Sequence, residues 1–191
     1  MKISGTGLEI SKTAYLIPLI VCLTDAWLLF GLCAVSVAVH ELGHWAALTL
    51  CGGRTERVTL SFFGVSLRYG GGISYGGEIY TALAGPGASL ILSFFAAGAG
   101  RLCGAAVLYE LAGVSLLFCL FNLLPLYPLD GGRAIYNALA YFFGLDPARR
   151  LTVIFRRLAA AAIAAGGLWL FAVQKNPMLL VCAAALLTVR T

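Results

Sequence analysis

The chain has 191 residues, of which 61% are hydrophobic and 11% are charged, and its mean hydropathy is +0.94. This composition excludes an ordinary soluble domain, in which about a quarter of the residues are charged, and is typical of an integral membrane protein. In such a protein the net charge of +5 reports membrane topology first, so no nucleic-acid partner is expected.

The apolar runs predict an all-α polytopic membrane protein with about six transmembrane segments in a single domain, residues 1–191. The first run, residues 14–23, is short for a full crossing at a rise of about 1.5 Å per residue. No cleavable signal is recognised before it, so we expect this segment to be retained. The other predicted segments are residues 27–50, 79–100, 102–124, 158–173 and 177–189, the last two forming the C-terminal helices within 151–190.

Residues 54–77 differ in pattern from the apolar runs on either side. Apolar and polar residues alternate from Val58 to Phe62, and a series of glycines follows. Alternation followed by glycines indicates strands and turns, so we predict one or two short β-hairpins at the membrane edge. Two roles stay open for this region, a plain connector or an edge strand that pairs with an extended peptide.

Glycine and proline predict two interruptions of helical structure. The first is Ala84-Gly85-Pro86-Gly87, early in the third segment. The second lies between Pro125 and Gly132, where prolines and glycines must interrupt a regular helix. Non-helical backbone at membrane depth is tolerated only where it is buried in protein or lines a wet cavity. Residues 146–157 are then expected to form a polar, arginine-rich connection.

The cationic residues orient the predicted segments. With six crossings and a cytoplasmic start, all of the 13 lysines and arginines except Arg101 and Lys175 fall on the cytoplasmic side. The same topology places His44 and Asp130 toward that side. We therefore expect a multi-pass protein of a bacterial cell membrane, with its functional site facing the cytoplasm.

The only two histidines, His40 and His44, flank Glu41 in the stretch His-Glu-Leu-Gly-His. Side chains four residues apart lie on one face of a helix, so the two imidazoles converge on one point. A neighbouring glutamate can deprotonate a metal-bound water. Two polar residues facing a bundle interior are the simpler alternative, but ionisable groups inside an apolar segment are costly and call for a functional explanation.

A catalytic zinc takes three protein ligands and leaves one position open for water. Asp130 is the preferred third ligand, because it follows the expected helix break and topology places it level with the histidines. Its alternative role is a helix N-cap. The other acidic residues considered are Asp25, Glu56, Glu78, Glu110 and Asp146.

Three motifs resemble those of the site-2 protease family of intramembrane zinc metalloproteases. They are His40-Glu41-Leu42-Gly43-His44, Ala84-Gly85-Pro86 and Asn122-x-x-Pro125-x-x-x-Leu129-Asp130-Gly131-Gly132. The resemblance covers a core of about residues 27–135. The family often carries an asparagine where this chain has Ser89, which leaves the role of that serine open.

The resemblance implies one Zn2+ ion held by His40, His44 and Asp130, with Glu41 as the general base. It also implies that Asn122 lies near the substrate or the developing oxyanion. The implied activity is cleavage of a membrane-associated protein substrate near the cytoplasmic face, which would activate a membrane-held regulator. The implied partners are this substrate, the lipid bilayer and a membrane-protein regulator of unknown identity.

The predicted layout leaves no room for a PDZ-type insertion between the second and third segments, and the chain stops short of a C-terminal CBS domain. It is most similar to the compact stage IV sporulation type of the family, which implies a role in sporulation. The alternative is a non-proteolytic metal-binding membrane protein, a transporter or a sensor. A transporter would be expected to show several ligand sites or an inverted repeat, and the sequence shows neither.

Overall fold

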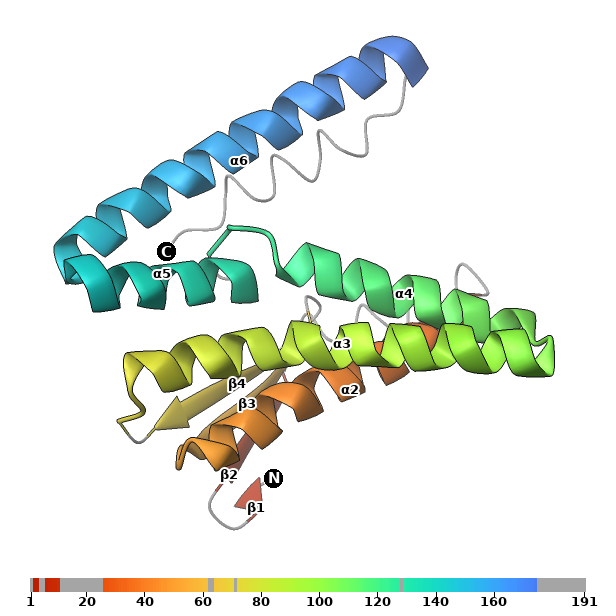
Figure 1. Cartoon of the computed structure of the whole chain (residues 1–191), viewed down its shortest axis with the longest axis horizontal. Coiled ribbons are helices and arrows are strands. Elements are labelled where there is room, and N and C mark those ends of the chain that lie inside the picture. Colours follow the sequence, from red (N-terminus) through yellow and green to blue (C-terminus); the bar gives the residue numbers. More distant parts are fainter. Residues whose placement is uncertain are drawn as a thin grey trace. The chain divides into compact units, whose positions relative to one another are not determined.

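The computed structural model describes residues 2–3, 6–10, 26–61, 64–70, 72–127 and 129–174. The predicted segments at residues 14–23 and 177–189 lie outside the described residues. The chain divides into two compact units, Met1–Asn122 and Leu123–Thr191. The elements in chain order (Figure 1) are β1 (Lys2–Ile3), β2 (Thr6–Ile10), α2 (Trp27–Leu50), β3 (Arg54–Ser61), β4 (Gly64–Gly70), α3 (Tyr75–Cys103), α4 (Ala106–Asn122), α5 (Asp130–Phe143) and α6 (Leu145–Gln174).

The helices α2, α3 and α4 pack on one another to form most of the first unit (Figure 1). Gly43 lets α2 approach α3 closely, because a Cβ there would lie nearer than 3.0 Å to the carbonyl oxygen of Ala84. A hydrogen bond of 2.9 Å between the hydroxyls of Ser36 and Ser115 joins α2 to α4. Small residues and hydroxyl hydrogen bonds are the usual means by which helices associate in lipid.

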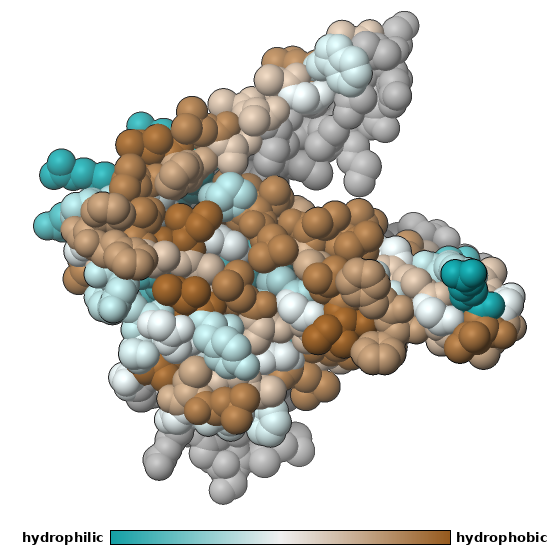
Figure 2. All heavy atoms as spheres, in the orientation of Figure 1, coloured by the Kyte–Doolittle hydropathy of each residue, from teal (hydrophilic) through white to brown (hydrophobic). Residues whose placement is uncertain are grey.

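The same helices bury polar side chains and expose large apolar ones. Phe95 is 75% exposed and Leu102 is 88% exposed, and Figure 2 shows apolar residues over much of the visible surface. Among the described residues, α2 and α3 are long and apolar enough to cross a membrane, and α4 is apolar but shorter, with 17 residues. A core helix of a soluble protein would be mostly buried, but the apolar windows of α2 and α3 are only 22% and 33% buried. Their exposed apolar surface is therefore suited to lipid.

The helix α3 begins and ends at well-defined caps. The Ser74 hydroxyl accepts a hydrogen bond from the Gly77 backbone N–H (3.2 Å), and Gly104 ends the helix in the left-handed region at φ +66°. Between them the helix runs without interruption through Pro86, so the predicted break at residues 84–87 is wrong. The preceding Gly85 has no Cβ to clash with the proline ring, which removes one of the penalties for helical backbone at that position.

The strands among the described residues form a sheet in the order β1-β2-β3-β4. The antiparallel pair β3 and β4 lies within the predicted 54–77 region, with Arg54 opposite Gly70 and Ser61 opposite Gly64. The pairing shifts register between Thr55 and Arg57. Strand β2 pairs with β3 in parallel, so residues before α2 join this sheet, which the sequence pattern did not predict.

The second unit begins with the predicted helix break. The turn before Asp130 packs tightly on the start of α5, because a Cβ at Gly131 would lie nearer than 3.0 Å to the backbone of Leu123. A Cβ at Gly132 would meet the backbone of Leu126 in the same way. These glycines let the chain fold back on itself at the break.

Two helical features of the second unit were not predicted. The helix α5 was not recognised as a separate element, and it packs against α6. Residues 146–157 were expected to be a polar connection, but they are the first half of the continuous helix α6, so that prediction is wrong. Arginine and leucine are good helix formers, and their propensity outweighs the loop character that the charge suggested.

Candidate metal centre

The helix α2 places His40 and His44 one turn apart, and both side chains are buried. Their Nε2 atoms lie 3.1 Å apart, and the ring planes meet at 81°. Two nitrogens bound to one zinc at about 2.0–2.1 Å lie about 3.3 Å apart when the site is tetrahedral. The observed separation is close to this value, so the pair fits a shared metal ion.

The opposite nitrogen of each ring is hydrogen-bonded to α3. His44 Nδ1 lies 2.7 Å from the carbonyl oxygen of Thr81, which can only accept, so Nδ1 carries the proton and Nε2 carries the lone pair of the ring. His40 Nδ1 lies 3.0 Å from the hydroxyl of Ser89, which is completely buried and can accept in the same way. Metal-ligating histidines donate their other ring N–H in this manner.

Two lone pairs this close repel each other unless a proton or a cation lies near both. A proton on His40 Nε2 could bridge the two rings in the metal-free protein, with the Ser89 hydroxyl then donating to Nδ1. A cation would be bound by both Nε2 atoms at once, with both Nδ1 atoms donating. Two buried imidazoles with oriented rings are therefore a donor set that fits Zn2+.

The ring of His44 occupies space that only a glycine leaves on α3. A Cβ on Gly85 would lie nearer than 3.0 Å to ring atoms of His44, whereas a Cβ on Gly87 would meet nothing within 4 Å. The Ala84-Gly85-Pro86 motif therefore makes room for a histidine ring rather than breaking the helix.

Sequence reasoning did not assign roles to Thr81 or Ser89, and it interpreted Gly85 only as a helix breaker. A signal was present, because these three positions are spaced by four residues. Residues i, i+4 and i+8 share one face of a helix, so small and polar residues at this spacing mark a face packed on a neighbour.

Glu41 and Asn122 are the other predicted site residues of the first unit. Glu41 is half-buried on α2, beside the two histidines. Asn122 ends α4, and its side-chain Nδ2 donates to the carbonyl oxygen of Phe118 (3.0 Å). Within the first unit, the structure therefore brings the two histidine rings together. Glu41 directly follows His40 on the same helix.

Asp130 belongs to the second unit, where it is the first residue of α5 and is buried. Leu129 takes the N-cap position, so the alternative prediction that Asp130 is the N-cap is wrong. Arg133 Nη1 lies 3.6 Å from Asp130 Oδ1, one turn further along α5.

No protein-family model matches the chain. Putative zinc metalloprotease Rip3 of Mycobacterium tuberculosis is 37% identical over 166 residues, which covers 71% of this chain and 40% of that protein. Zinc metalloprotease MJ0392 of Methanocaldococcus jannaschii is 33% identical over 122 residues, covering 61% of this chain and 35% of that protein. Stage IV sporulation protein FB of Bacillus subtilis is 31% identical over 126 residues, covering 61% and 42%.

The chain thus spans about 40% of the length of the curated relatives it matches. The solved structure of a site-2 protease from Methanocaldococcus jannaschii matches with a TM-score of 0.73 and 25% sequence identity. That match covers 97% of this chain and 89% of the solved one. Identity to the sporulation protein is no higher than to the other relatives, so the comparisons do not select the sporulation branch.

Proposed function

The chain belongs to the site-2 protease family of intramembrane zinc metalloproteases, and on that premise we propose that it cleaves a peptide bond in a membrane-associated protein substrate. Its cofactor is Zn2+. The observation that carries the proposal is the pair of buried Nε2 atoms at 3.1 Å, with a glutamate beside them on an apolar helix. A water-activating metal and an adjacent base together serve hydrolysis.

Asp130 is the proposed third ligand, beside His40 and His44. A catalytic zinc needs a third protein ligand, and the Leu129-Asp130-Gly131-Gly132 stretch resembles the family signature. Burial of the Asp130 carboxylate supports this assignment, because a buried negative charge is stable only near positive charge. Arg133 supplies part of that charge, and a bound cation would supply more.

In the proposed mechanism, Zn2+ supplies a Lewis acid that makes water nucleophilic near neutral pH. Glu41 accepts a proton from the attacking water at a carboxylate oxygen and then passes it to the leaving amide nitrogen. The peptide bond is thereby converted to a carboxyl group and an amine. Asn122 donates to the developing oxyanion with one of the two hydrogens on its Nδ2, since the other can stay bonded to Phe118.

The scissile segment must be extended, because the peptide bonds of a helix are shielded by their own hydrogen bonds. Among the described strands, β4 stands at one end of the sheet order, so one of its edges is open to another strand. The proposal is that the substrate adds a strand at this edge. The position of the sheet at the membrane edge is part of the same proposal.

The membrane arrangement is also proposed: about six crossings of a bacterial cell membrane, with the site toward the cytoplasm. The exposed apolar surfaces of α2 and α3 support it. With six crossings, all of the lysines and arginines except Arg101 and Lys175 would fall on one side, as the positive-inside rule requires. The finer role in this proposal is activation of a membrane-held regulator, in sporulation or elsewhere.

The central test uses purified protein and a labelled single-span substrate. Glu41→Gln should abolish cleavage while zinc content and folding stay normal, because the amide keeps the shape of the side chain but cannot accept a proton. A zinc chelator should abolish cleavage by the unsubstituted chain. Near-normal proteolysis by Glu41→Gln would falsify the catalytic assignment.

Asp130→Ala tests the third ligand separately. This variant should lose bound zinc in a metal analysis, because two histidines alone bind the ion far more weakly than three ligands do. Full zinc occupancy in Asp130→Ala would remove Asp130 from the ligand set. An unsubstituted chain that binds zinc but cleaves none of the substrates tried would favour the non-proteolytic alternative.

A further inference from the structure

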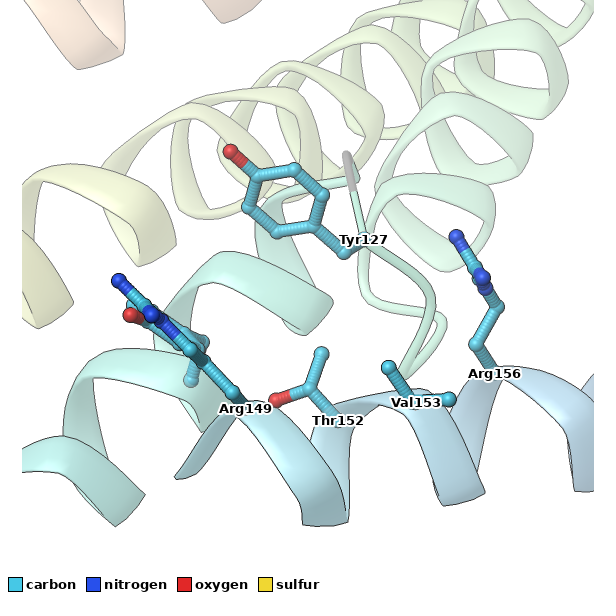
Figure 3. A pocket seen from close by; sticks show the side chains of 6 residues that line it. Tyr127, Arg149, Thr152, Val153 and Arg156 are labelled. Carbon is cyan, nitrogen blue, oxygen red and sulfur yellow. The ribbon is translucent and has the colours of Figure 1, made fainter. Parts of the chain in front are cut away.

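The second unit contains a cavity of about 470 Å³ between α6 and the segment that leads into α5 (Figure 3). Its lining residues are Tyr127, Tyr136, Arg149, Thr152, Val153 and Arg156. Arg156 already has an interaction partner, and the Thr152 hydroxyl oxygen has no accessible surface. These walls indicate no particular ligand, and the feature with a functional consequence lies in the first unit.

That feature is a pair of serines that joins α2 to α4. The hydroxyl oxygens of Ser36 and Ser115 lie 2.9 Å apart, and both side chains are fully buried. Ser36 lies one turn before His40, on the buried face of α2. Ser115 lies seven residues before Asn122 on α4, a spacing that places both residues on one face of the helix. The pair therefore links the helix of the histidines to the helix of the proposed oxyanion donor.

The helices α2 and α4 run in the same direction, because each of them is antiparallel to α3 (Figure 1). As residue numbers rise along α2 or α4, the numbers of the residues that they contact on α3 fall. The contacts that show this are those of His40 with Ser89 and of His44 with Thr81 for α2, and those of Tyr109 with Gly100 and of Ala112 with Ser93 for α4. Distances from the serine pair can therefore be counted toward the same end of both helices.

Counted in this way, Asn122 lies about level with the histidines. At a rise of about 1.5 Å per residue, Asn122 is about 10 Å beyond Ser115 along α4. His40 and His44 are about 6 and 12 Å beyond Ser36 along α2. A slip of α4 by one turn would move Asn122 by about 5.4 Å, which is farther than a hydrogen bond can follow. The register of α4 on α2 therefore sets how closely Asn122 approaches the level of the metal centre.

The serine pair is the contact of α4 that is specific to one register. In lipid, apolar contacts between helices gain little over contacts with lipid tails, so they do not prevent a slip. Ser93 also bonds α4, but it donates to the carbonyl of Ala112, and a slip would bring another backbone carbonyl into that place. Ser115 is the one serine or threonine in the sequence of α4, so a slip would break its bond to Ser36 with no replacement.

We propose that Ser36 and Ser115 are positioning residues, which set the register of α4 on α2 and so hold Asn122 level with the two histidines. The inference rests on the role proposed for Asn122 in the protease. Because both serines are fully buried, they contact no substrate and act through Asn122. An oxyanion donor acts in the transition state, so loss of the serine bond should slow the chemical step and leave substrate binding unchanged.

Ser115→Ala removes the bond without adding volume, and the Ser36 hydroxyl can then bond to a carbonyl of its own helix. With the purified full chain and the labelled single-span substrate, kcat should fall by about tenfold. This is a part of the roughly 100- to 1,000-fold loss expected when an oxyanion donor is removed completely. KM and bound zinc should stay within about twofold.

Two further variants keep the test independent of the folding of any one of them. Ser36→Ala alone and Ser36→Ala combined with Ser115→Ala should each show the same fall in kcat as Ser115→Ala alone. All three lack the same single hydrogen bond, so their effects should not add. A double variant whose loss is the product of the two single losses would contradict a role for the bond itself.

Ser93→Ala is the matched control. It also removes a hydrogen bond that a buried hydroxyl makes to α4, so it should lower the midpoint of thermal unfolding. It leaves the serine pair in place, so kcat should stay within about twofold. A fall in kcat as large as that of Ser115→Ala would overturn the proposal, because the effect would then be one of general packing.

The closing experiment tests whether the serines act through Asn122. Asn122→Ala should lower kcat by about 100-fold or more, and adding Ser115→Ala should then cost less than about twofold, because no amide is left to misplace. Independent losses in this double variant, or an unchanged kcat in Ser115→Ala, would overturn the positioning role and leave the proposed protease mechanism intact. A normal kcat in Asn122→Ala would instead remove Asn122 from that mechanism, and the positioning role with it.

Discussion

His40 and His44 lie one turn apart on the same helix, yet α3 orients the two rings by different means. His44 is held by the backbone carbonyl of Thr81 and by the space beside Gly85. His40 is held by a side-chain hydroxyl, that of Ser89. A backbone carbonyl stays the same whatever residue carries it, whereas a hydroxyl is lost in a single substitution.

The difference shows where each half of the site is vulnerable. The surroundings of His44 should resist loss of a hydrogen-bonding side chain but not added volume. The surroundings of His40 should respond in the opposite way, to the loss or replacement of one polar group. Family members that carry an asparagine at this position would keep a polar partner for this ring, which gives Ser89 the role that the sequence left open.

The largest effect is expected from added volume beside His44. Gly85→Ala would place a Cβ on the ring, so the ring must move, and cleavage should fall by more than about 100-fold with loss of bound zinc. Metal analysis and the cleavage assay with the single-span substrate measure both. The control is Gly87→Ala on the same helix, which faces open space and should keep zinc and activity. Normal zinc binding in Gly85→Ala would show that the ring does not need this space.

A smaller effect is expected beside His40. Ser89→Ala should weaken zinc binding by about 10- to 100-fold, the usual cost of removing a partner that orients a metal ligand. Competition with a chelator measures the affinity, and histidine 15N shifts report whether Nδ1 of His40 still carries the proton. Ser89→Asn should restore much of the affinity.

Ser93 provides the control for this prediction. It is also a buried serine on α3, but its hydroxyl donates to the carbonyl oxygen of Ala112 (2.8 Å) rather than to a histidine. Ser93→Ala should lower stability without changing zinc affinity. If both serine variants lose zinc equally, the Ser89 effect is one of general packing and not of ring orientation.

The smallest effect is expected at Thr81. Its carbonyl orients His44, but its own hydroxyl is buried and has no hydrogen-bond partner among the described residues. Thr81→Val keeps the carbonyl and removes only that hydroxyl, so zinc affinity should stay within about twofold and stability should not fall. A large loss of zinc in the same competition assay would mean that the side chain, and not the backbone, orients this ring.

Local spacing made part of this site predictable. The i, i+4 spacing of the two histidines requires only that residues 27–50 form a helix, which their apolar composition favours, and α2 is that helix. The helix break before Asp130 was also predictable, because prolines and glycines act on their own immediate backbone. The same residue types also predicted a break at residues 84–87, but α3 passes through Pro86 without interruption.

Other features depend on residues distant in the sequence. The parallel pairing of β2 with β3 joins segments about 50 residues apart, and no local pattern specifies such a partner. The helical first half of α6 has charges that suggested a connection, but it packs against α5, which the sequence pattern did not identify.

By itself, the sequence determined the ligand types, their spacing on one helix and the apolar character of that helix, because each of these is a property of neighbouring residues. Only the tertiary structure decided what orients the two imidazoles. The partners lie on α3, one of them is a backbone carbonyl that every residue carries, and the space for His44 is the absence of a side chain at Gly85. Contacts made by backbone and by empty space have no residue type of their own, so only the packing of α2 on α3 reveals them.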